Sequence, residues 1–322
     1  MKAILIGVLS AFFFAFTFVL NRSMDLAGGS WIWSASLRYL FMVPLLLALV
    51  LMRGNLKPLL AEMKARPWPW LVWSFVGFVL FYAPISYAAS TGPSWLVAGT
   101  WQITIISGSL LVPLFYDVIE TSEGVRKVRK KIPFKGMGMS LLILAGVAVM
   151  QVQHATAISA NELWLGILPV LLASFCYPLG NRKMMEVVQG RLDAFQRTLG
   201  MTLASLPFWL ALSVYGLTTV GAPSSGQAVQ SLLVALSSGV IATVLFFKAT
   251  DLARGSMAQL AAVEATQSIE VVFALLGEVV ILGMAMPSAL SMVGMGLVMV
   301  GMILHSFVSQ GPGIRRRSGV NA

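Results

Sequence analysis

The sequence predicts an all-α integral membrane protein with ten transmembrane helices, arranged as two five-helix repeats of inverted topology. Three observations lead to this fold class: an apolar composition, apolar blocks of membrane-spanning length, and basic residues gathered in alternate loops. Hydrophobic residues make up 58% of the 322 residues and charged residues only 11%, with a mean hydropathy of +0.85. A soluble domain is about half apolar and about a quarter charged.

Ten apolar blocks are each about long enough to cross a bilayer core of about 30 Å at 1.5 Å per residue. They are residues 3–20, 31–52, 68–89, 93–115, 136–151, 162–180, 194–215, 227–247, 257–282 and 287–308. The first block is longer than the apolar region of a typical signal peptide, and no clean cleavage site follows it. We therefore expect it to be the first spanning helix.

The basic residues predict the sidedness of the chain. Eighteen of them fall at the termini and in alternate loops: Lys2, Arg53, Lys57, Lys64, Arg66, Arg126, Lys127, Arg129, Lys130, Lys131, Lys135, Arg182, Lys183, Arg191, Arg254, Arg315, Arg316 and Arg317. Only Arg22 falls in the opposite loops, and Arg38, Arg197 and Lys248 lie within or at the ends of helices. Lysine and arginine hold loops in the cytoplasm, so we expect a multi-pass membrane protein with cytoplasmic N- and C-termini. The net charge of +10 does not indicate a nucleic-acid partner, because the chain has no basic face with interleaved aromatic residues.

Four pairs of short segments indicate an internal repeat between residues 1–151 and residues 152–309. The pairs are FTFVLNRSM with FCYPLGNRKM, RYLFM with RTLGM, STGPS with ARGSM, and YDVI with GEVV, at offsets of 160, 159, 163 and 161 residues. Because five is odd, the second repeat enters the membrane from the opposite side. Inverted repeats are typical of secondary transporters; the alternative is two similar bundles kept for stability alone. The remaining residues, 310–322, are rich in glycine and arginine, and we expect a disordered, basic cytoplasmic tail.

The layout resembles the drug/metabolite transporter superfamily, of the EamA-like ten-helix type and its multidrug resistance efflux branch. The features that carry the resemblance are the two repeats, Arg38 and Arg197 near the start of the second helix of each, and LLGE at 275–278. The resemblance implies a plasma-membrane exporter of small organic molecules, drugs or metabolites, with a cavity between the repeats. The chain departs from the small four-helix multidrug transporters, because its first helix has no acidic residue. Proton coupling through that position is therefore not implied.

The predicted ninth helix carries acidic residues in a strongly apolar segment. At 100° per residue, Gln267, Glu270 and Glu278 lie about −60°, −120° and −40° from Glu264, so all four fit one arc of about 120°. Carboxylates within a membrane usually face the bundle interior or water. Counted at 1.5 Å per residue, Glu264 and Glu270 lie about 10 Å and 20 Å into the helix, and Glu278 lies beyond about 30 Å, at the interface.

Two interpretations of Glu264 and Glu270 remain open. A buried glutamate can exchange a proton or hold a cationic substrate, with Glu264 as first candidate and Glu270 as second. Alternatively, each is a structural carboxylate paired with Arg38, Arg197 or Lys248, or bonded to neighbouring helices. For Glu278 we favour a structural role.

Other candidates for the site are arginine, aromatic and amide side chains. Arg38 and Arg197 either reach the membrane interface, bind an anionic substrate group or exchange partners during transport. Aromatic rings suit flat or cationic substrates, and the aromatic candidates are Phe16, Tyr87, Trp101 and Tyr177. Trp101 with Gln102, and Phe16 with Asn21, are favoured because polar groups lie nearby.

The sequence contains no constellation typical of an enzyme, a metal site or a cofactor site. Its two histidines, His154 and His305, fall near opposite faces, and there is no paired acidic metal motif and no GxxxxGK[ST] loop. We therefore expect a secondary active transporter that exports a small molecule across the bilayer by alternating access. Proton antiport and uniport both remain open, as do a monomer and a homodimer. A passive facilitator or channel is the main alternative, and a membrane-embedded enzyme is less favoured.

Overall fold

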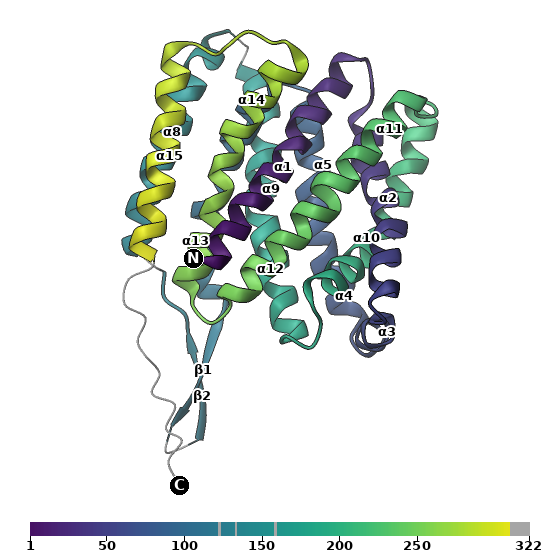
Figure 1. Ribbon diagram of the computed structural model, residues 1–322, viewed down its shortest axis with the longest axis vertical. Helices are drawn as coiled ribbons and strands as arrows, with labels where there is room; N and C mark the ends of the chain where they lie inside the picture. The colour runs from purple at the N-terminus through teal and green to yellow at the C-terminus, as the bar shows by residue number, and fades with distance from the viewer. Residues whose placement is uncertain (122–123, 133, 158–159, 310–322) are drawn as a thin grey trace.

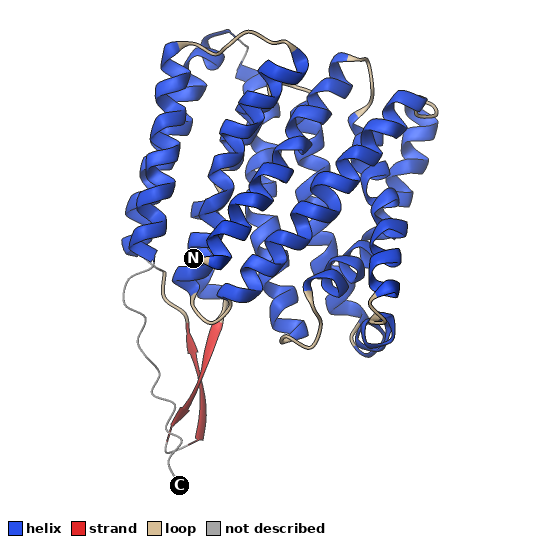
Figure 2. Ribbon diagram, in the orientation of Figure 1, coloured by secondary structure: helices blue, strands red, loops and turns tan. Residues whose placement is uncertain are grey.

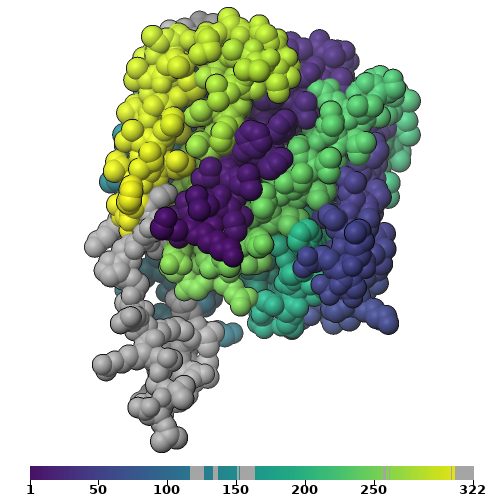
Figure 3. All heavy atoms as spheres, viewed as in Figure 1, coloured from purple at the N-terminus to yellow at the C-terminus, as the bar shows by residue number. Residues whose placement is uncertain are grey.

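The computed structural model describes residues 1–121, 124–132, 134–157 and 160–309. Its helices lie side by side in one bundle, and a two-stranded hairpin projects from one end (Figures 1 and 2). We call this the hairpin end of the bundle and the opposite end the far end. Helix α1 (Lys2–Leu26) packs against both α12 and α14, and the space-filling view shows it lying across one face of the molecule (Figure 3).

The first half of the chain contains most of the short elements. In order they are α1, α2 (Trp31–Met52), α3 (Leu56–Ala65), α4 (Pro67–Ser74), η1 (Phe75–Val79), α5 (Leu80–Ala89), α6 (Ser94–Trp101), α7 (Thr104–Leu110), η2 (Val112–Leu114), β1 (Tyr116–Thr121), β2 (Gly124–Arg129) and α8 (Phe134–Ala157).

Among its described residues, the second half contains helical elements joined by turns and loops. Its elements are α9 (Ala160–Val188), α10 (Ala194–Thr219), α11 (Ser225–Val234), η3 (Ala235–Ala242), α12 (Thr243–Ala253), α13 (Met257–Ala265), η4 (Thr266–Ile269), α14 (Glu270–Leu282) and α15 (Ala289–Ser309). Side-chain caps set several of the helix starts. The clearest is Asp193, which forms a reciprocal capping box with Gln196 at the start of α10.

The helices agree in part with the expectation of ten spanning segments. Within the described residues, seven helices are long and apolar enough to cross a membrane, and shorter apolar helices occupy 137–150 and 289–305. The predicted fourth helix, 93–115, is not continuous, because it is divided into α6, α7 and η2. The number of spanning helices and the repeat therefore remain predictions.

The predicted fourth and ninth helices are both interrupted. In the fourth, the backbone N–H groups of Gln102 and Ile103 bond to carbonyls three residues earlier, and the Gln102 side chain donates to the Ala98 carbonyl. In the ninth, Thr266 and Ser268 hydroxyls donate to carbonyls three residues earlier, and the chain tightens into the 3₁₀ turn η4. Polar side chains that bond the local backbone compete with regular helix, which explains both interruptions.

The predicted third and eighth helices each contain a π-helical segment. These segments are η1 between α4 and α5, and η3 between α11 and α12. At η1, Gly77 meets Gly180 of α9 so closely that a Cβ built on Gly180 would lie 2.3 Å from the Gly77 Cα. π-Helical segments are rare and are frequent at functional sites, and these two bring α9 and α1 close to their neighbours.

The helical fold class holds apart from two short strands that the sequence analysis did not predict. Residues 116–121 and 124–129 pair antiparallel, with Tyr116 opposite Arg129 and Thr121 opposite Gly124. The first strand contains valine, isoleucine and threonine and the second contains two valines, and these residue types favour strands. The predicted disordered tail, 310–322, lies outside the described residues.

Candidate functional site

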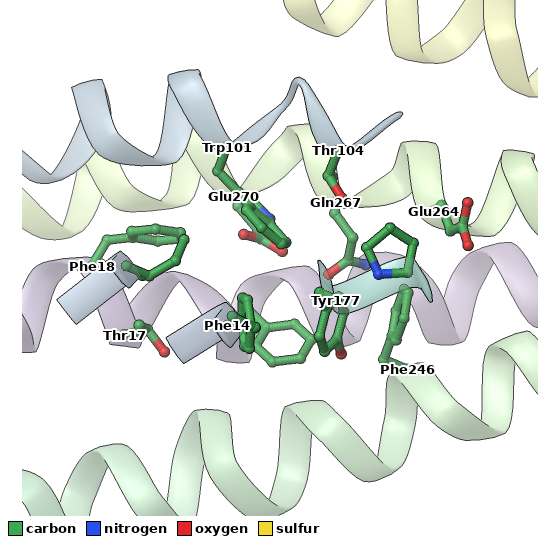
Figure 4. A pocket seen from close by; sticks show the side chains of 13 residues that line it. Phe14, Thr17, Phe18, Trp101, Thr104, Tyr177, Phe246, Glu264, Gln267 and Glu270 are labelled. Atoms are coloured by element: carbon green, nitrogen blue, oxygen red, sulfur yellow. The ribbon is translucent and has the colours of Figure 1, made fainter. Parts of the chain in front are cut away.

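A central cavity lies between the first and ninth predicted helices and the helices that pack against them. It is lined by Phe14, Thr17, Phe18, Phe81, Ile85, Trp101, Thr104, Tyr177, Pro178, Phe246, Glu264, Gln267 and Glu270 (Figure 4). The free volume at its centre is about 20 Å³, which is room for about one water molecule. This conformation is therefore closed around the site.

The two helix interruptions meet beside this cavity. Gln102, in the turn between α6 and α7, donates through Nε2 to the Gln267 carbonyl in η4 at 3.2 Å. Gln267 in turn donates to the carbonyl of Gly7 in α1 at 3.2 Å. The side-chain carbonyls of both glutamines lack hydrogen-bond partners in the described part of the chain. Unwound backbone in a membrane is tolerated where it lines a cavity, and here it carries unsatisfied polar atoms.

Glu270 is the carboxylate of the cavity that has no partner. Its side chain is 2% exposed, and no ion pair or hydrogen bond to it occurs among the residues that the structure describes. The 3₁₀ turn places it in the cavity. Side chains three residues apart are eclipsed in such a turn, so Glu270 and Gln267 point to the same cavity (Figure 4). An unpaired buried carboxylate is costly in a membrane and can be compensated by a cation or a proton.

Glu264 lies at one end of the cavity and is paired. Its Oε2 lies 2.5 Å from Nη2 of Arg182, and its Oε1 accepts from Nε of the same guanidinium at 3.0 Å. The prediction that Arg182 lies in a loop is wrong. Helix α9 continues to Val188, which puts Arg182 inside the helix with a side chain only 3% exposed. The alternative partners expected for Glu264 were Arg38, Arg197 or Lys248, and none of these is the partner.

Aromatic rings form a further part of the cavity wall. The Tyr177 ring lies 4.4 Å from the Phe81 ring, 5.4 Å from the Phe246 ring and 5.9 Å from the Trp101 ring, measured between centroids. The Tyr177 hydroxyl has no hydrogen-bond partner within the described chain. A cavity with aromatic walls and one free carboxylate suits an organic cation, because the ring faces and the carboxylate both attract positive charge.

The structure separates the sequence candidates into two groups. Glu264, Gln267, Glu270, Trp101 and Tyr177 line the cavity, and Gln102 lies directly behind it.

The other candidates lie outside the cavity. Phe16 lines a separate groove between α1 and α14, together with Phe12 and Phe273. Tyr87 contacts Trp31 through an edge-to-face ring pair. Asn21 donates to the Tyr82 hydroxyl at 3.2 Å.

The arginines and Glu278 are all enclosed by protein. Arg38 and Arg197 are 1% and 2% exposed. Arg197 pairs with Asp251 at 2.5 Å, whereas Arg38 lies over the Tyr82 ring, 3.8 Å from its centroid. Glu278 is 3% exposed, and it accepts a hydrogen bond from the Trp95 backbone N–H at 3.4 Å.

Sequence reasoning missed Arg182 and four cavity rings, Phe14, Phe18, Phe81 and Phe246. The repeat contained a signal for Arg182, because it matches Arg22 in the first repeat, at the end of a spanning helix. The rings gave no signal, since apolar residues in apolar helices are not distinguishable by sequence. Among the described residues no group of three or more histidine, cysteine or acidic side chains could hold a metal ion.

Comparisons with known proteins agree with this architecture. A family model described as "EmrE: Putative multidrug resistance efflux transporter" matches residues 1–311. The chain is 58% identical over 310 residues to the uncharacterized protein YjlA of Bacillus subtilis (strain 168), covering 96% of each chain. It is also 51% identical over 270 residues to an uncharacterized 42.1 kDa protein of Shouchella clausii, covering 84% of this chain and 70% of that one.

A solved crystal structure shares the fold. It superposes with a TM-score of 0.68 at 14% sequence identity, and the match covers 96% of this chain and 99% of that one. The family model spans nearly the whole sequence, and the bundle, interrupted helices and central cavity are those of a multi-pass membrane protein. The chain therefore belongs to the EmrE family, the "Putative multidrug resistance efflux transporter" family of the drug/metabolite transporter type.

Proposed function

We propose that the protein is a secondary active transporter that exports lipophilic organic cations across the plasma membrane. The observation that carries the proposal is Glu270, a buried carboxylate without a partner in the described chain, in a cavity walled by aromatic rings. A hydrophobic cation would supply the missing charge while its apolar surface packs against Phe81, Tyr177 and Phe246. A neutral or anionic substrate would leave the carboxylate uncompensated.

Proton coupling follows from the same carboxylate. Glu270 has one charge to compensate, so a proton and a cationic substrate would compete for it. Binding of a proton from one side would release the cation to that side, and loss of the proton to the other side would restore the site. This exchange is proton antiport, and it needs no acidic residue in the first helix.

Alternating access is supported by matched irregularities in the two halves of the chain. The π-helical segments η1 and η3 begin at residues 75 and 235, and the interrupted helices begin at residues 94 and 257. These offsets, 235 − 75 = 160 and 257 − 94 = 163, equal those of the sequence repeat. Two halves of inverted topology, residues 1–151 and 152–309, would exchange conformations around a fixed central site.

The orientation follows from the basic residues. Both described ends of the chain lie toward the hairpin end of the bundle (Figure 1), and the basic loops around Arg53, Arg66 and Arg191 connect elements at that end. Because basic loops remain in the cytoplasm, the hairpin end is cytoplasmic and transport proceeds from the hairpin end to the far end.

The direct test is transport by the purified protein in proteoliposomes. Tetraphenylphosphonium, an aromatic monovalent cation, is the probe, and its movement is measured with and without an imposed pH gradient. We expect uphill movement driven by the gradient, loss of that movement in Glu270→Gln, and partial recovery in Glu270→Asp. Phe16→Leu is the matched control, because Phe16 lies in the separate groove.

Three results would contradict the proposal. If the probe moves only down its own electrochemical gradient, with or without a pH gradient, the protein is a passive facilitator. Full transport by Glu270→Gln would remove the proposed role of the carboxylate. A protein that moves neutral or anionic aromatic compounds but not the cation would reverse the proposed charge preference.

A further inference from the structure

A second cavity lies at the hairpin end of the bundle. It has a volume of about 260 Å³ and is lined by Phe115, Lys130, Arg182, Met185, Glu186, Gln189, Arg254 and Leu260. Gln189 and Arg254 are exposed, so this cavity reaches the surface. We call it the vestibule. It is more than ten times larger than the free volume of the central cavity.

The Arg182–Glu264 ion pair stands between the two cavities. Arg182 lines the vestibule and Glu264 lines the central cavity. Both carboxylate oxygens accept from the guanidinium, and the remaining Nη1 donates to the Gly108 carbonyl. The three residues belong to α9, α13 and α7, so the contact ties together three helices that surround the passage.

Packing around the pair leaves no spare room. A Cβ built on Gly108 would lie 2.6 Å from Oε2 of Glu264 and 3.1 Å from Nη2 of Arg182. The two side chains are 3% and 5% exposed. The ion pair therefore lies, tightly packed, between a residue that lines the vestibule and one that lines the central cavity.

We propose that Arg182, Glu264 and the Gly108 carbonyl form the closed gate between the vestibule and the central cavity. In the closed gate the Arg182 guanidinium neutralises the Glu264 carboxylate. An entering organic cation displaces the guanidinium from Glu264 before it reaches Glu270. The biological role of this gate rests on the proposed transport function. Its action as a barrier to water-soluble reagents is independent of that function.

The arginine at the matched repeat position behaves differently. Arg22, near the far end of α1, pairs with Asp25 one turn away at 3.0 Å, and both side chains are partly exposed. This pair joins two residues of one helix and ties no helices together. Arg22 therefore provides the matched control for Arg182.

Cysteine labelling tests the gate without a transport assay. Cys176 is the only cysteine of the sequence, so Cys176→Ala gives a cysteine-free background. Thr104→Cys reports on the central cavity, and Met185→Cys reports on the vestibule. The reagent is a membrane-impermeant methanethiosulfonate that carries a quaternary ammonium group, applied to sealed vesicles of both orientations. The orientation in which Met185→Cys reacts identifies the side that faces the hairpin end.

The gate predicts a specific pattern of labelling rates from that side. Thr104→Cys should react slowly, and adding Arg182→Met should raise its rate by about tenfold or more, because an unpaired buried glutamate favours the open, hydrated arrangement. Adding Arg22→Met should leave the rate unchanged. The charge-exchanged pair Arg182→Glu with Glu264→Arg should return labelling toward the slow rate.

An unchanged rate in Arg182→Met would overturn the gate, provided that the variant elutes as a single species in detergent. An equal increase with Arg22→Met would also overturn it, because the effect would then be general loosening. Fast labelling in the charge-exchanged pair would show that the ion pair does not close the passage. Failure of cation transport with the expected labelling pattern would contradict the proposed function and leave the gate intact.

Discussion

Replacing Glu264 by glutamine should lower the free energy of unfolding, whereas replacing Glu270 by glutamine should leave it unchanged or raise it, although the residues lie six positions apart. Glu264→Gln leaves the Arg182 guanidinium, 3% exposed, without its counter-charge. Removing one partner of a buried ion pair costs about 3–5 kcal/mol. We therefore expect a loss of that size.

Glu270→Gln removes a carboxylate that has no partner among the described residues. An acidic side chain at the centre of a membrane helix costs about 2.5–3.5 kcal/mol on insertion scales, so the variant should be between unchanged and more stable by about 3 kcal/mol. Transport should be lost nonetheless. A functional residue that lowers stability is the expected cost of a preformed binding site.

Equilibrium unfolding in mixed detergent micelles, followed by the fluorescence of the nine tryptophans, measures both changes. Glu278→Gln is the control, because Glu278 accepts one long contact from Trp95, and its change should stay within about 1 kcal/mol. A Glu264→Gln variant as stable as the native protein would refute the reasoning. So would a Glu270→Gln variant that loses more stability than Glu264→Gln.

Three further predictions concern the surface, the helix packing and the cavity wall. The hydrogen bond from the Arg191 guanidinium lowers the pKa of Glu62. The pair therefore stabilises the fold at neutral pH, and this contribution is lost as the pH falls through the lowered pKa. In the same unfolding assay, Glu62→Gln should cost about 0.5–1 kcal/mol at neutral pH and progressively less in acid. Gly180→Ala should lose about 1–3 kcal/mol through overpacking against the Gly77 backbone, while Gly138→Ala, with nothing within 4 Å of its added Cβ, should be neutral in that assay. Trp101→Ala should raise the KM for tetraphenylphosphonium about five- to tenfold through lost ring contact, and an unchanged KM in initial-rate measurements would remove Trp101 from the site.

Much of the fold could be predicted because its signals are local. Each apolar block of the sequence coincides with a helix or a run of helical segments, since long apolar segments in a bilayer must satisfy their own backbone hydrogen bonds. The hairpin was missed because its charged residues concealed a β-branched pattern. The break at Gln102 was missed because a single amide side chain bonding the Ala98 carbonyl leaves no periodic trace.

The candidate site was predicted unevenly. The helical wheel identified Glu264, Gln267 and Glu270 as one polar face, and all three line the cavity. The wheel assumed a regular helix, whereas η4 is a 3₁₀ turn that brings Gln267 and Glu270 into register. Phe16 was chosen for its polar neighbour Asn21 and Tyr87 for its aromatic ring, yet Phe16 lines a separate groove and Tyr87 contacts Trp31.

The sequence by itself determined the membrane class, the positions of the apolar segments and the acidic stripe, because hydropathy and helical period depend only on neighbouring residues. Only the tertiary structure decided which glutamate is paired and which is free. Arg182 and Glu264 are 82 residues apart in the chain, and their contact exists because α7, α9 and α13 pack around one passage. Charge pairing in a membrane interior depends on which helices meet, and the chain order does not encode that directly.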